Sequence, residues 1–494
     1  MKLLNSQQIR ELDTATMARA SIKSIDLMER AARECTTWIL KNLKGEKFLI
    51  VCGTGNNGGD GMAIARQLAE AGKDCRVQVL DRLREGTPDF RTNFERLKLA
   101  PVNSFSIIET TEDFPTPDED TVIIDALFGT GISRPVDGLA AAVIHRINKL
   151  PNFIVSIDLP SGLPADFDAK WEGPNVLADC TLTFHLPKTS FLFEKTGNST
   201  GRTVVLEIGL SRGVHEGMNS DWILTDAGSV CHLLLRERPF AHKGSAGSAA
   251  LVVGSTQMPG AGVLASLGAL YSGVGLVHVF GDYRVHFPPE IIHHSEAFNP
   301  QEQPKCTALC VGPGITTTPE SVYKLDQLLD QKALPLVLDA DALNILGEQN
   351  WLHRLPAMSV LTPHPGEFDR LFGPSQNDVD RLQLLRKNAT ETGCIILLKG
   401  AYTRIATPDG RLWFNGSGNA GMAKGGMGDV LSGLITGLIA RGLSPLDAAL
   451  AGTFIHGLAG DLVREKSGPE GVTAGALAAA LSDAFELTRG HRGG

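Results

Sequence analysis

The sequence lacks the cysteine patterns of zinc-binding and disulfide-rich proteins. Its eight cysteines are scattered over 494 residues, and no Cys-x-x-Cys motif is present. The closest pair, Cys306 and Cys310, has no cluster of histidines beside it. A structural zinc site and a disulfide framework are therefore not expected, and the pattern fits the reducing cytoplasm.

Excess positive charge and long apolar runs are missing as well. The 46 Lys and Arg residues are outnumbered by 55 Asp and Glu residues, which gives a net charge of −9. This balance disfavours a nucleic-acid surface, although a small anionic ligand needs only local positive potential. One stretch without acidic or basic residues, Ala261 to Phe280, contains several glycines and serines and predicts a buried helix followed by a buried strand. Neither a signal peptide nor a membrane partner is expected.

Strand-like apolar runs alternate with helical segments, which is typical of α/β proteins with parallel sheets. The pattern lapses between Leu210 and Ser220, so we expect two α/β domains, over residues 1–215 and 225–494. The expected strands of the first are Phe48–Cys52, Cys75–Leu80, Thr121–Leu127, Phe153–Asp158, Cys180–Phe184 and Val204–Ile208. Those of the second are Ser248–Gly254, Ala308–Val311, Leu334–Asp339, Ser359–Leu361, Cys394–Lys399 and Tyr402–Ala406.

A glycine-rich loop from Gly53 to Gly61 follows the first strand and opens a helix expected over Gly61–Ala71. It satisfies Gly-x-Gly-x-x-Gly, and Asp81 ends the next strand about 20 residues later, so a two-domain NAD-dependent oxidoreductase is one hypothesis. The carboxylate of Asp60 does not suit that hypothesis, because it competes with a phosphate for the helix N–H groups. Asp60 as a plain N-cap is the alternative.

Further polar residues follow other strands of the first half. Asn57, Asp125 and Ser161 offer amide, carboxylate and hydroxyl oxygens, which suit a monovalent cation. Each of them alone is more often a turn residue. Asp158 stands at another strand end and Lys188 adds a cation, so a site at this edge of the sheet is expected.

Three motifs of this half, in order, resemble the NAD(P)HX epimerase domain (the YjeF N-terminal domain): Gly55–Gly61, Asp125–Gly131 and Ile157–Gly162. The resemblance spans roughly residues 1–215. It implies a Rossmann-like three-layer domain that epimerises the C6 hydroxyl of hydrated NADH or NADPH (NADHX, NADPHX). It also implies K⁺ held by Asn57, Asp125 and Ser161, and a dinucleotide site lined by Asn56, Asn57, Gly58, Gly59, Asp60, Gly129, Thr130, Gly131, Ile132, Ser133, Arg134, Pro135 and Asp158. Asp158 is the expected acid–base catalyst, with Lys188 second. Arg134 meets either a phosphate or solvent.

The second half carries a glycine loop, Lys424-Gly425-Gly426-Met427-Gly428-Asp429, before a helix expected over Asp429–Arg441. Glycine amides and a helix N-terminus together hold phosphate. An aspartate beside them would repel that phosphate unless it has another task, such as taking a proton from a hydroxyl. The alternative is a tight turn with Asp429 as N-cap.

With Pro259–Gly262, Gly312–Gly314, Thr362–Glu367 and Lys399–Gly400, this loop resembles the ADP/ATP-dependent NAD(P)HX dehydratase domain, which is a ribokinase-like three-layer fold. The resemblance covers roughly residues 225–494. It implies that Lys399, Gly400, Ala401, Tyr402, Thr403 and Gly428 hold ADP, accompanied by Mg²⁺. It further implies that Ala261, Gly314, His364 and Asp429 hold the hydrate. Lys424 replaces a common Ser or Thr and is either an extra phosphate contact or solvated.

Together the halves resemble the fused NAD(P)H-hydrate repair enzymes. The expected reaction is ADP-dependent dehydration of the S epimer, with Asp429 as base, fed by epimerisation of the R epimer. Expected partners are the small molecules NADHX, NADPHX and ADP or ATP, and a cytoplasmic homo-oligomer is expected. A small-molecule kinase, the NAD-dependent oxidoreductase, and a first half that only binds a ligand remain as alternatives.

Overall fold

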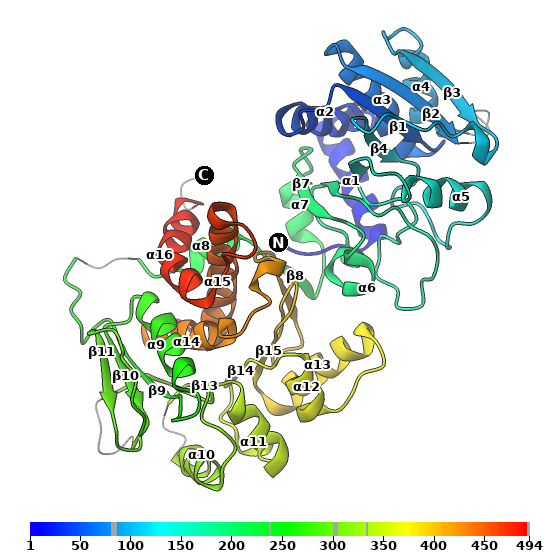
Figure 1. The fold of residues 1–494 in the computed structure, drawn as a ribbon. Coiled ribbons are helices and arrows are strands. Elements are labelled where there is room, and N and C mark those ends of the chain that lie inside the picture. Colours follow the sequence, from blue (N-terminus) through cyan, green and yellow to red (C-terminus); the bar gives the residue numbers. More distant parts are fainter. Residues whose placement is uncertain (81–85, 237–238, 300–304, 332–333, 492–494) are drawn as a thin grey trace. The chain divides into compact units, whose positions relative to one another are not determined.

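The computed structural model describes residues 1–80, 86–236, 239–299, 305–331 and 334–491. The chain divides into two compact units, Lys2–Ser220 and Asp221–Gly494 together with Met1. Each unit has its own sheet (Figure 1), so the predicted α/β class is confirmed. Asp81, named above for the oxidoreductase hypothesis, lies outside the described residues.

The first unit contains a seven-stranded parallel sheet in the order β3-β2-β1-β4-β5-β6-β7. Its strands are β1 (Lys47–Cys52), β2 (Asp74–Leu80), β3 (Ser104–Ile108), β4 (Val122–Ala126), β5 (Ile154–Ile157), β6 (Cys180–Phe184) and β7 (Arg202–Leu206). The strand order reverses between β1 and β4, where parallel sheets collect ligands at their carboxyl ends. Strand β3 was not predicted, because its serines alternate with apolar residues at an exposed sheet edge.

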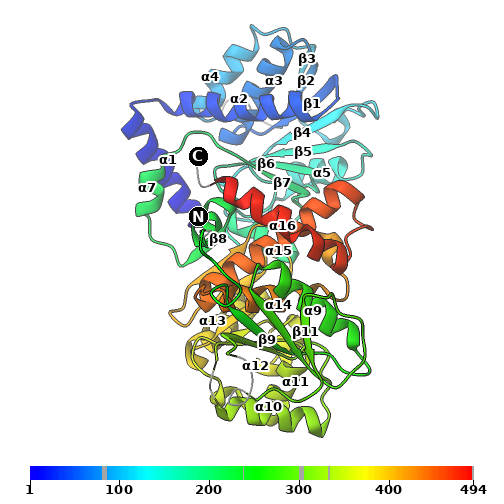
Figure 2. The same ribbon diagram turned by 90° about the vertical axis from the view of Figure 1, so that its left-hand side faces the viewer.

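Helices cover both faces of this sheet. They are α1 (Ser6–Ala20), α2 (Ser24–Asn42), α3 (Asn56–Glu70), α4 (Pro88–Leu97), α5 (Gly138–Ile147), α6 (Glu194–Gly197) and α7 (Arg212–Gly217), with 3-10 turns at Thr111–Asp113 and Thr189–Leu192. Helices α2 and α3 lie on one face and α5 on the other (Figure 2), and their apolar residues belong to two separate cores. Helix α3 begins at Asn56 and not at Gly61, with Gly55 as N-cap, so the interpretation of Asp60 as N-cap is wrong.

Two glycines allow this early helix start. A Cβ on Gly53 would lie 2.0 Å from the carbonyl oxygen of Leu127, and a Cβ on Gly58 would lie 1.8 Å from that of Gly53. The first turn of α3 therefore lies directly against the ends of β1 and β4, at a distance only glycine permits.

The second unit contains a ten-stranded sheet in the order β11-β10-β9-β12-β13-β14-β15-β16-β17-β8. Its strands are β8 (Trp222–Thr225), β9 (Ser248–Val252), β10 (Leu276–Phe280), β11 (Ile291–His294), β12 (Ala308–Val311), β13 (Leu336–Leu338), β14 (Val360–Leu361), β15 (Ile395–Leu398), β16 (Arg404–Ala406) and β17 (Leu412–Asn415). β16 runs antiparallel to both of its neighbours and the other pairs are parallel. β8 precedes the region where strands were expected to resume.

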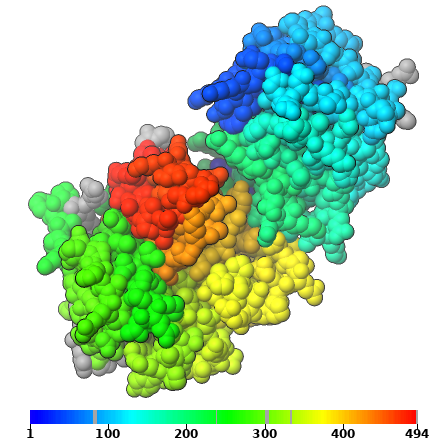
Figure 3. Space-filling model, viewed as in Figure 1, coloured from blue at the N-terminus to red at the C-terminus, as the bar shows by residue number. Residues whose placement is uncertain are grey.

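The helices of this unit are α8 (Ala227–Leu233), α9 (Pro259–Tyr271), α10 (Pro319–Gln331), α11 (Asp341–Gln349), α12 (Pro365–Phe372), α13 (Asp378–Thr392), α14 (Met427–Ala440), α15 (Pro445–Ser467) and α16 (Ala474–Gly490), with 3-10 turns at Leu352–Arg354 and Ala420–Met422. Helices α9, α14, α15 and α16 share one core, and α10 and α11 pack on the opposite face. In Figure 3 the orange and red C-terminal helices lie against the green segment that includes α9.

Two apolar segments that resemble membrane spans in the sequence are interior elements. The uncharged stretch from Ala261 to Phe280 is α9 followed by β10, as predicted. In the described part of the chain, α15 alone is long and apolar enough to cross a membrane, and 72% of its most apolar window is buried inside the structure. Its burial is that of a core helix.

Candidate active sites

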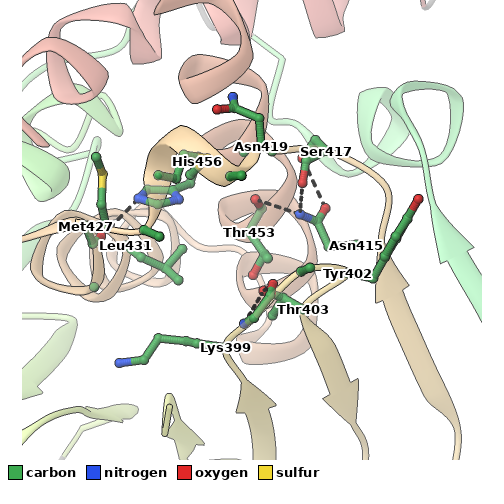
Figure 4. A pocket seen from close by; sticks show the side chains of 18 of the residues that line it. Lys399, Tyr402, Thr403, Asn415, Ser417, Asn419, Met427, Leu431, Thr453 and His456 are labelled. Atoms are coloured by element: carbon green, nitrogen blue, oxygen red, sulfur yellow. Dashed lines mark hydrogen bonds between the residues drawn. The ribbon is translucent and has the colours of Figure 1, made fainter. Parts of the chain in front are cut away.

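A cavity of about 530 Å³ opens in the second unit between the β15–β16 turn, the segment after β17, and helices α14 and α15. Six of its lining residues are those expected at the nucleotide: Lys399, Gly400, Ala401, Tyr402, Thr403 and Gly428. The hairpin turn keeps its shape because Thr403 donates its hydroxyl to the carbonyl oxygen of Gly400 at 3.0 Å. The structure thus collects the whole set at one cavity, and Figure 4 labels Lys399, Tyr402 and Thr403 among them.

The opposite wall of this cavity was not predicted. It includes Asn415, Ser417, Thr453 and His456, the last two from the buried helix α15. Burial lowers the pKa of His456 to about 4, so its ring is neutral and its Nε2–H donates to the carbonyl oxygen of Met427 at 3.0 Å (Figure 4). One feature of the sequence could have indicated this wall: Thr453 and His456 are polar residues within the otherwise apolar α15.

Asp429 lies beside this cavity, in the first turn of α14. Gly426, with φ of 88°, is the N-cap of that helix, so Asp429 is not the cap. Burial, followed by the charge of Asp339, raises the pKa of the Asp429 carboxyl to about 7, and Lys399 opposes this rise. A carboxyl that titrates near neutral pH is suited to accept a proton from a hydroxyl.

Besides lining the cavity, Lys399 forms ion pairs with two acidic side chains, which the sequence did not predict. Its ammonium lies 2.7 Å from the carboxylate of Asp339 and 3.7 Å from that of Glu367, and both acids are buried. Burial alone would lower the pKa of Lys399, but Asp339 and Glu367 outweigh it and raise that pKa. A permanent positive charge therefore stands under the start of α14, where a Cβ on Gly428 would lie 3.2 Å from the Lys399 nitrogen.

The four residues expected at the hydrate do not line the large cavity. Gly314 and Ala261 are neighbours, because a Cβ on Gly314 would lie 2.8 Å from that of Ala261. His364 is half-exposed and caps α12, and its Nδ1 accepts from the N–H groups of Gly366 and Glu367. Asp429 interacts electrostatically with Asp339 and Lys399, and Lys399 also interacts with Glu367 in the first turn of α12, the helix that His364 caps.

Lys424 is already engaged in the structure. Its ammonium donates to the carbonyl oxygens of Pro469 and Glu470 at 3.0 and 2.7 Å. This arrangement ties the glycine loop to the segment before α16, while the Lys424 side chain remains exposed to solvent.

In the first unit, Asn57, Asp125 and Ser161 meet around the backbone of Phe128. Asn57 donates its Nδ2–H to the Phe128 carbonyl at 2.9 Å, and Ser161 donates its hydroxyl to Asp125 at 2.5 Å. Among the residues that the structure describes, the buried Oδ1 atom of Asn57 has no hydrogen-bond partner. Since a buried unpaired oxygen is costly, this atom and the fully buried Asp125 carboxyl fit a bound cation.

A second cavity, of about 140 Å³, lies between α1, α2, α3 and the ends of β5 and β6. Asn56, Asp60, Thr130 and Asp158 of the expected dinucleotide site line it, together with Lys188. Lys188 is almost fully enclosed and lies 2.7 Å from the Asp158 carboxylate. Asp158 itself has φ of 67°, a left-handed conformation that aspartate tolerates better than most residues.

The loop after β4, residues 129–135, is only partly at this cavity. Thr130 lines it, whereas Gly131, Ser133, Arg134 and Pro135 are exposed. Asp13 was not predicted at this site, because α1 brings it to the cavity from far upstream of every motif.

Profiles of two families match the chain in the order of its units. The profile described as YjeF-related protein N-terminus matches residues 24–190, and that of NAD(P)H-hydrate dehydratase matches residues 249–483. The bifunctional NAD(P)H-hydrate repair enzyme Nnr of Moorella thermoacetica is 36% identical over 507 residues, which is 97% of this chain and 95% of that protein. The chain belongs to the bifunctional NAD(P)H-hydrate repair enzyme family.

Another repair enzyme of this family, from Coxiella burnetii, is 33% identical across 96% of this chain and 97% of its own. Among solved structures, the ADP/ATP-dependent NAD(P)H-hydrate dehydratase of Bacillus subtilis, co-crystallised with ATP and Mg²⁺, is 32% identical. It covers 54% of this chain and 98% of its own, with a TM-score of 0.48. The two family matches agree with the predicted order of a YjeF N-terminal domain followed by an NAD(P)H-hydrate dehydratase domain.

Proposed function

We propose that this chain repairs hydrated NADH and NADPH, with an epimerase in the first unit and an ADP-dependent dehydratase in the second. The observation that carries the proposal is the position of Asp429. It is a half-buried carboxyl with a pKa of about 7, one residue after Gly428, which lines the large cavity. A base and a phosphate-binding helix start are thereby adjacent, which a phosphorylation-driven elimination requires.

In the dehydratase, Asp429 takes the proton of the C6 hydroxyl, and that oxygen attacks the terminal phosphoryl group of the nucleotide. The glycine amides before α14 and the partial positive charge of the helix N-terminus stabilise the transferring group. The C6–O bond of the resulting phosphate ester then breaks, because phosphate is a far better leaving group than hydroxide. The ring nitrogen supplies the electrons, and loss of the C5 proton restores the reduced nicotinamide.

The nucleotide lies, in this proposal, against Lys399–Thr403 and Gly428. Mg²⁺ would neutralise its phosphates, and the carboxylates near the glycine loop are hard oxygen donors of the type Mg²⁺ prefers. Asp339 is the nearest such group to Lys399, while Ala261, Gly314 and His364 would face the hydrate. ADP is proposed as the donor.

In the epimerase, Asp158 is proposed as an acid–base residue held in place by Lys188. The orphaned Asn57 oxygen, with Asp125 and Ser161, would hold K⁺. This cation would fix the Phe128 carbonyl and the loop that carries Thr130. The exposed Arg134 would then meet a dinucleotide phosphate only when substrate is present.

A cytoplasmic location and a homo-oligomeric state are part of the proposal. All eight cysteines are buried and free, which agrees with a reducing compartment. The two rival activities would give different results. A small-molecule kinase would leave a stable phosphorylated compound. An oxidoreductase would transfer a hydride and would need neither ADP nor ATP.

The test is to incubate purified protein with S-NADHX, ADP and Mg²⁺. Equal amounts of reduced nicotinamide, AMP and phosphate are expected. A phosphorylated hydrate that accumulates, or no reaction with either ADP or ATP, would contradict the dehydratase assignment.

A further inference from the structure

The smaller cavity is lined by more carboxyl groups than a site with Asp158 as its single acid–base residue needs. Three carboxyl groups line it from three separate elements: Asp13 on α1, Asp60 on α3 and Asp158 after β5. Lys188 pairs with Asp158 at 2.7 Å. Throughout the described ranges, no hydrogen bond or ion pair engages the carboxyl of Asp13 or of Asp60. Two carboxyls thus face the cavity without a partner.

One ammonium cannot balance three neighbouring carboxylates in an enclosed space, so the cluster retains protons near neutral pH. Burial and then Asp158 raise the pKa of Asp13 to about 6, against the effect of Lys188. Burial, Asp158 and Asp13 raise the pKa of Asp60 well above its usual value. The raised pKa favours the neutral form of Asp60, whereas Asp13, with a pKa of about 6, can exchange its proton. The other charged residues adjoining Asp13 on α1, Arg10 and Glu11, are exposed to solvent.

We propose that Asp13 is a second acid–base residue of the epimerase site and works together with Asp158. The inference rests on the proposed epimerase function. Inverting C6 requires that the hydroxyl leave from one face of the ring and that water return to the other. Two carboxyls from different walls of the cavity can serve two faces, which a single carboxyl cannot.

The proton and electron changes balance without any other reactant. The protonated carboxyl gives its proton to the C6 hydroxyl, the C6–O bond breaks, and the ring-nitrogen lone pair forms a C6–N double bond as water leaves. Water then adds to the opposite face of C6, the second carboxylate takes its proton, and the double-bond electrons return to nitrogen. In the reverse direction Asp13 and Asp158 exchange roles, so the active state holds one proton between them.

The test compares Asp13→Asn with the wild type in the exchange of R- and S-NADHX, followed by chromatographic separation of the epimers. Wild-type kcat/KM should fall as pH rises through about 6, because the shared proton is then lost. In Asp13→Asn the rate should drop by about 100-fold or more, and this decline with pH should disappear. Asp13→Glu, which keeps a carboxyl, should recover part of the rate.

The matched control is Glu11→Gln, an exposed change on the same helix whose carboxylate accepts a hydrogen bond from Gln7. It should keep both the rate and the pH profile. An Asp13→Asn variant that exchanges epimers at the wild-type rate overturns the inference. So does a slow variant with an unchanged pH profile and a lowered unfolding temperature, since Asp13 would then be structural. If the wild type exchanges no epimers, the proposed epimerase function fails, and the inference with it.

Discussion

The Lys399 ammonium lies 2.7 Å from the Asp339 carboxylate, and the charges of this pair both influence the pKa of Asp429. Asp339 raises the pKa of Asp429, and Lys399 lowers it. The lysine was expected only as part of a nucleotide-binding turn. In the structure it also belongs to the electrostatic surroundings of the proposed base, which links the nucleotide cavity to the site of proton transfer.

Asp339→Asn should shift the pH dependence of dehydration. Asp429 must be ionised to act as a base, so wild-type kcat/KM should rise as pH increases through about 7. Removing the Asp339 charge lowers the pKa of Asp429, and the rise should move to lower pH by about one unit, which corresponds to ~1.4 kcal/mol. Asp341→Asn is the matched control, because Asp341 raises the same pKa less, and its shift should be smaller. An unmoved profile in Asp339→Asn would refute the coupling.

Asp429→Asn should abolish the ADP-dependent return of reduced-nicotinamide absorbance, by about 10²–10⁴-fold, because the hydroxyl loses its proton acceptor. Exchange between R- and S-NADHX should continue at the wild-type rate, since it takes place in the other unit. Asp447→Asn is a control, because Asp447 lies at the start of α15 and its carboxylate accepts a solvent-exposed hydrogen bond from the Ser444 hydroxyl. Loss of exchange in Asp429→Asn would contradict the assignment of the two reactions to separate units.

The sequence located these sites through their loops, because glycine-rich turns at strand ends have residue types dictated by backbone geometry. Lys399–Thr403 and Gly428 were expected at one ligand and do line one cavity. Strand boundaries within the buried sheets were also close, and the expected strand at Cys180–Phe184 matches β6. The loops could be predicted because their φ angles require glycine, and the strands could be predicted because buried strands are continuous apolar runs.

The partners that approach from distant segments could not be predicted. Asp13 and Thr453 lie on helices, and their local sequences predict nothing beyond a helix. Their place at a cavity depends on how those elements pack, which a single sequence does not encode locally. The start of α3 was misplaced for a related reason. Gly58 and Gly59 disfavour a helix by propensity, but Gly58 packs closely against Gly53 at the end of β1, and Gly59 packs against Met28 of α2 and Phe90 of α4.

Epimer exchange should depend on K⁺. At constant ionic strength, replacing KCl by choline chloride should slow exchange about tenfold, equivalent to ~1.4 kcal/mol of lost transition-state stabilisation. Asn57→Leu removes the buried unpaired oxygen and should abolish the difference between the two salts. If the wild type reacts equally fast in both salts, Asn57, Asp125 and Ser161 do not form a K⁺ site.

Lys188→Met should destabilise the first unit, because it leaves Asp158 charged and unpaired in a buried position. The expected cost is about 3–5 kcal/mol, seen as a lower unfolding midpoint in urea. The double variant Lys188→Met with Asp158→Asn should regain most of this stability and still lack epimer exchange. If the double variant is no more stable than the single one, the ion pair is not the cause of the loss.

The most direct measurement of the whole account is the recovery of reduced nicotinamide from a mixture of R- and S-NADHX with ADP, Mg²⁺ and K⁺. The wild type should convert the entire mixture, while Asp158→Asn should stop once the S epimer is exhausted, apart from slow spontaneous exchange. Complete recovery by Asp158→Asn at the wild-type rate, or no recovery by the wild type, would contradict the account.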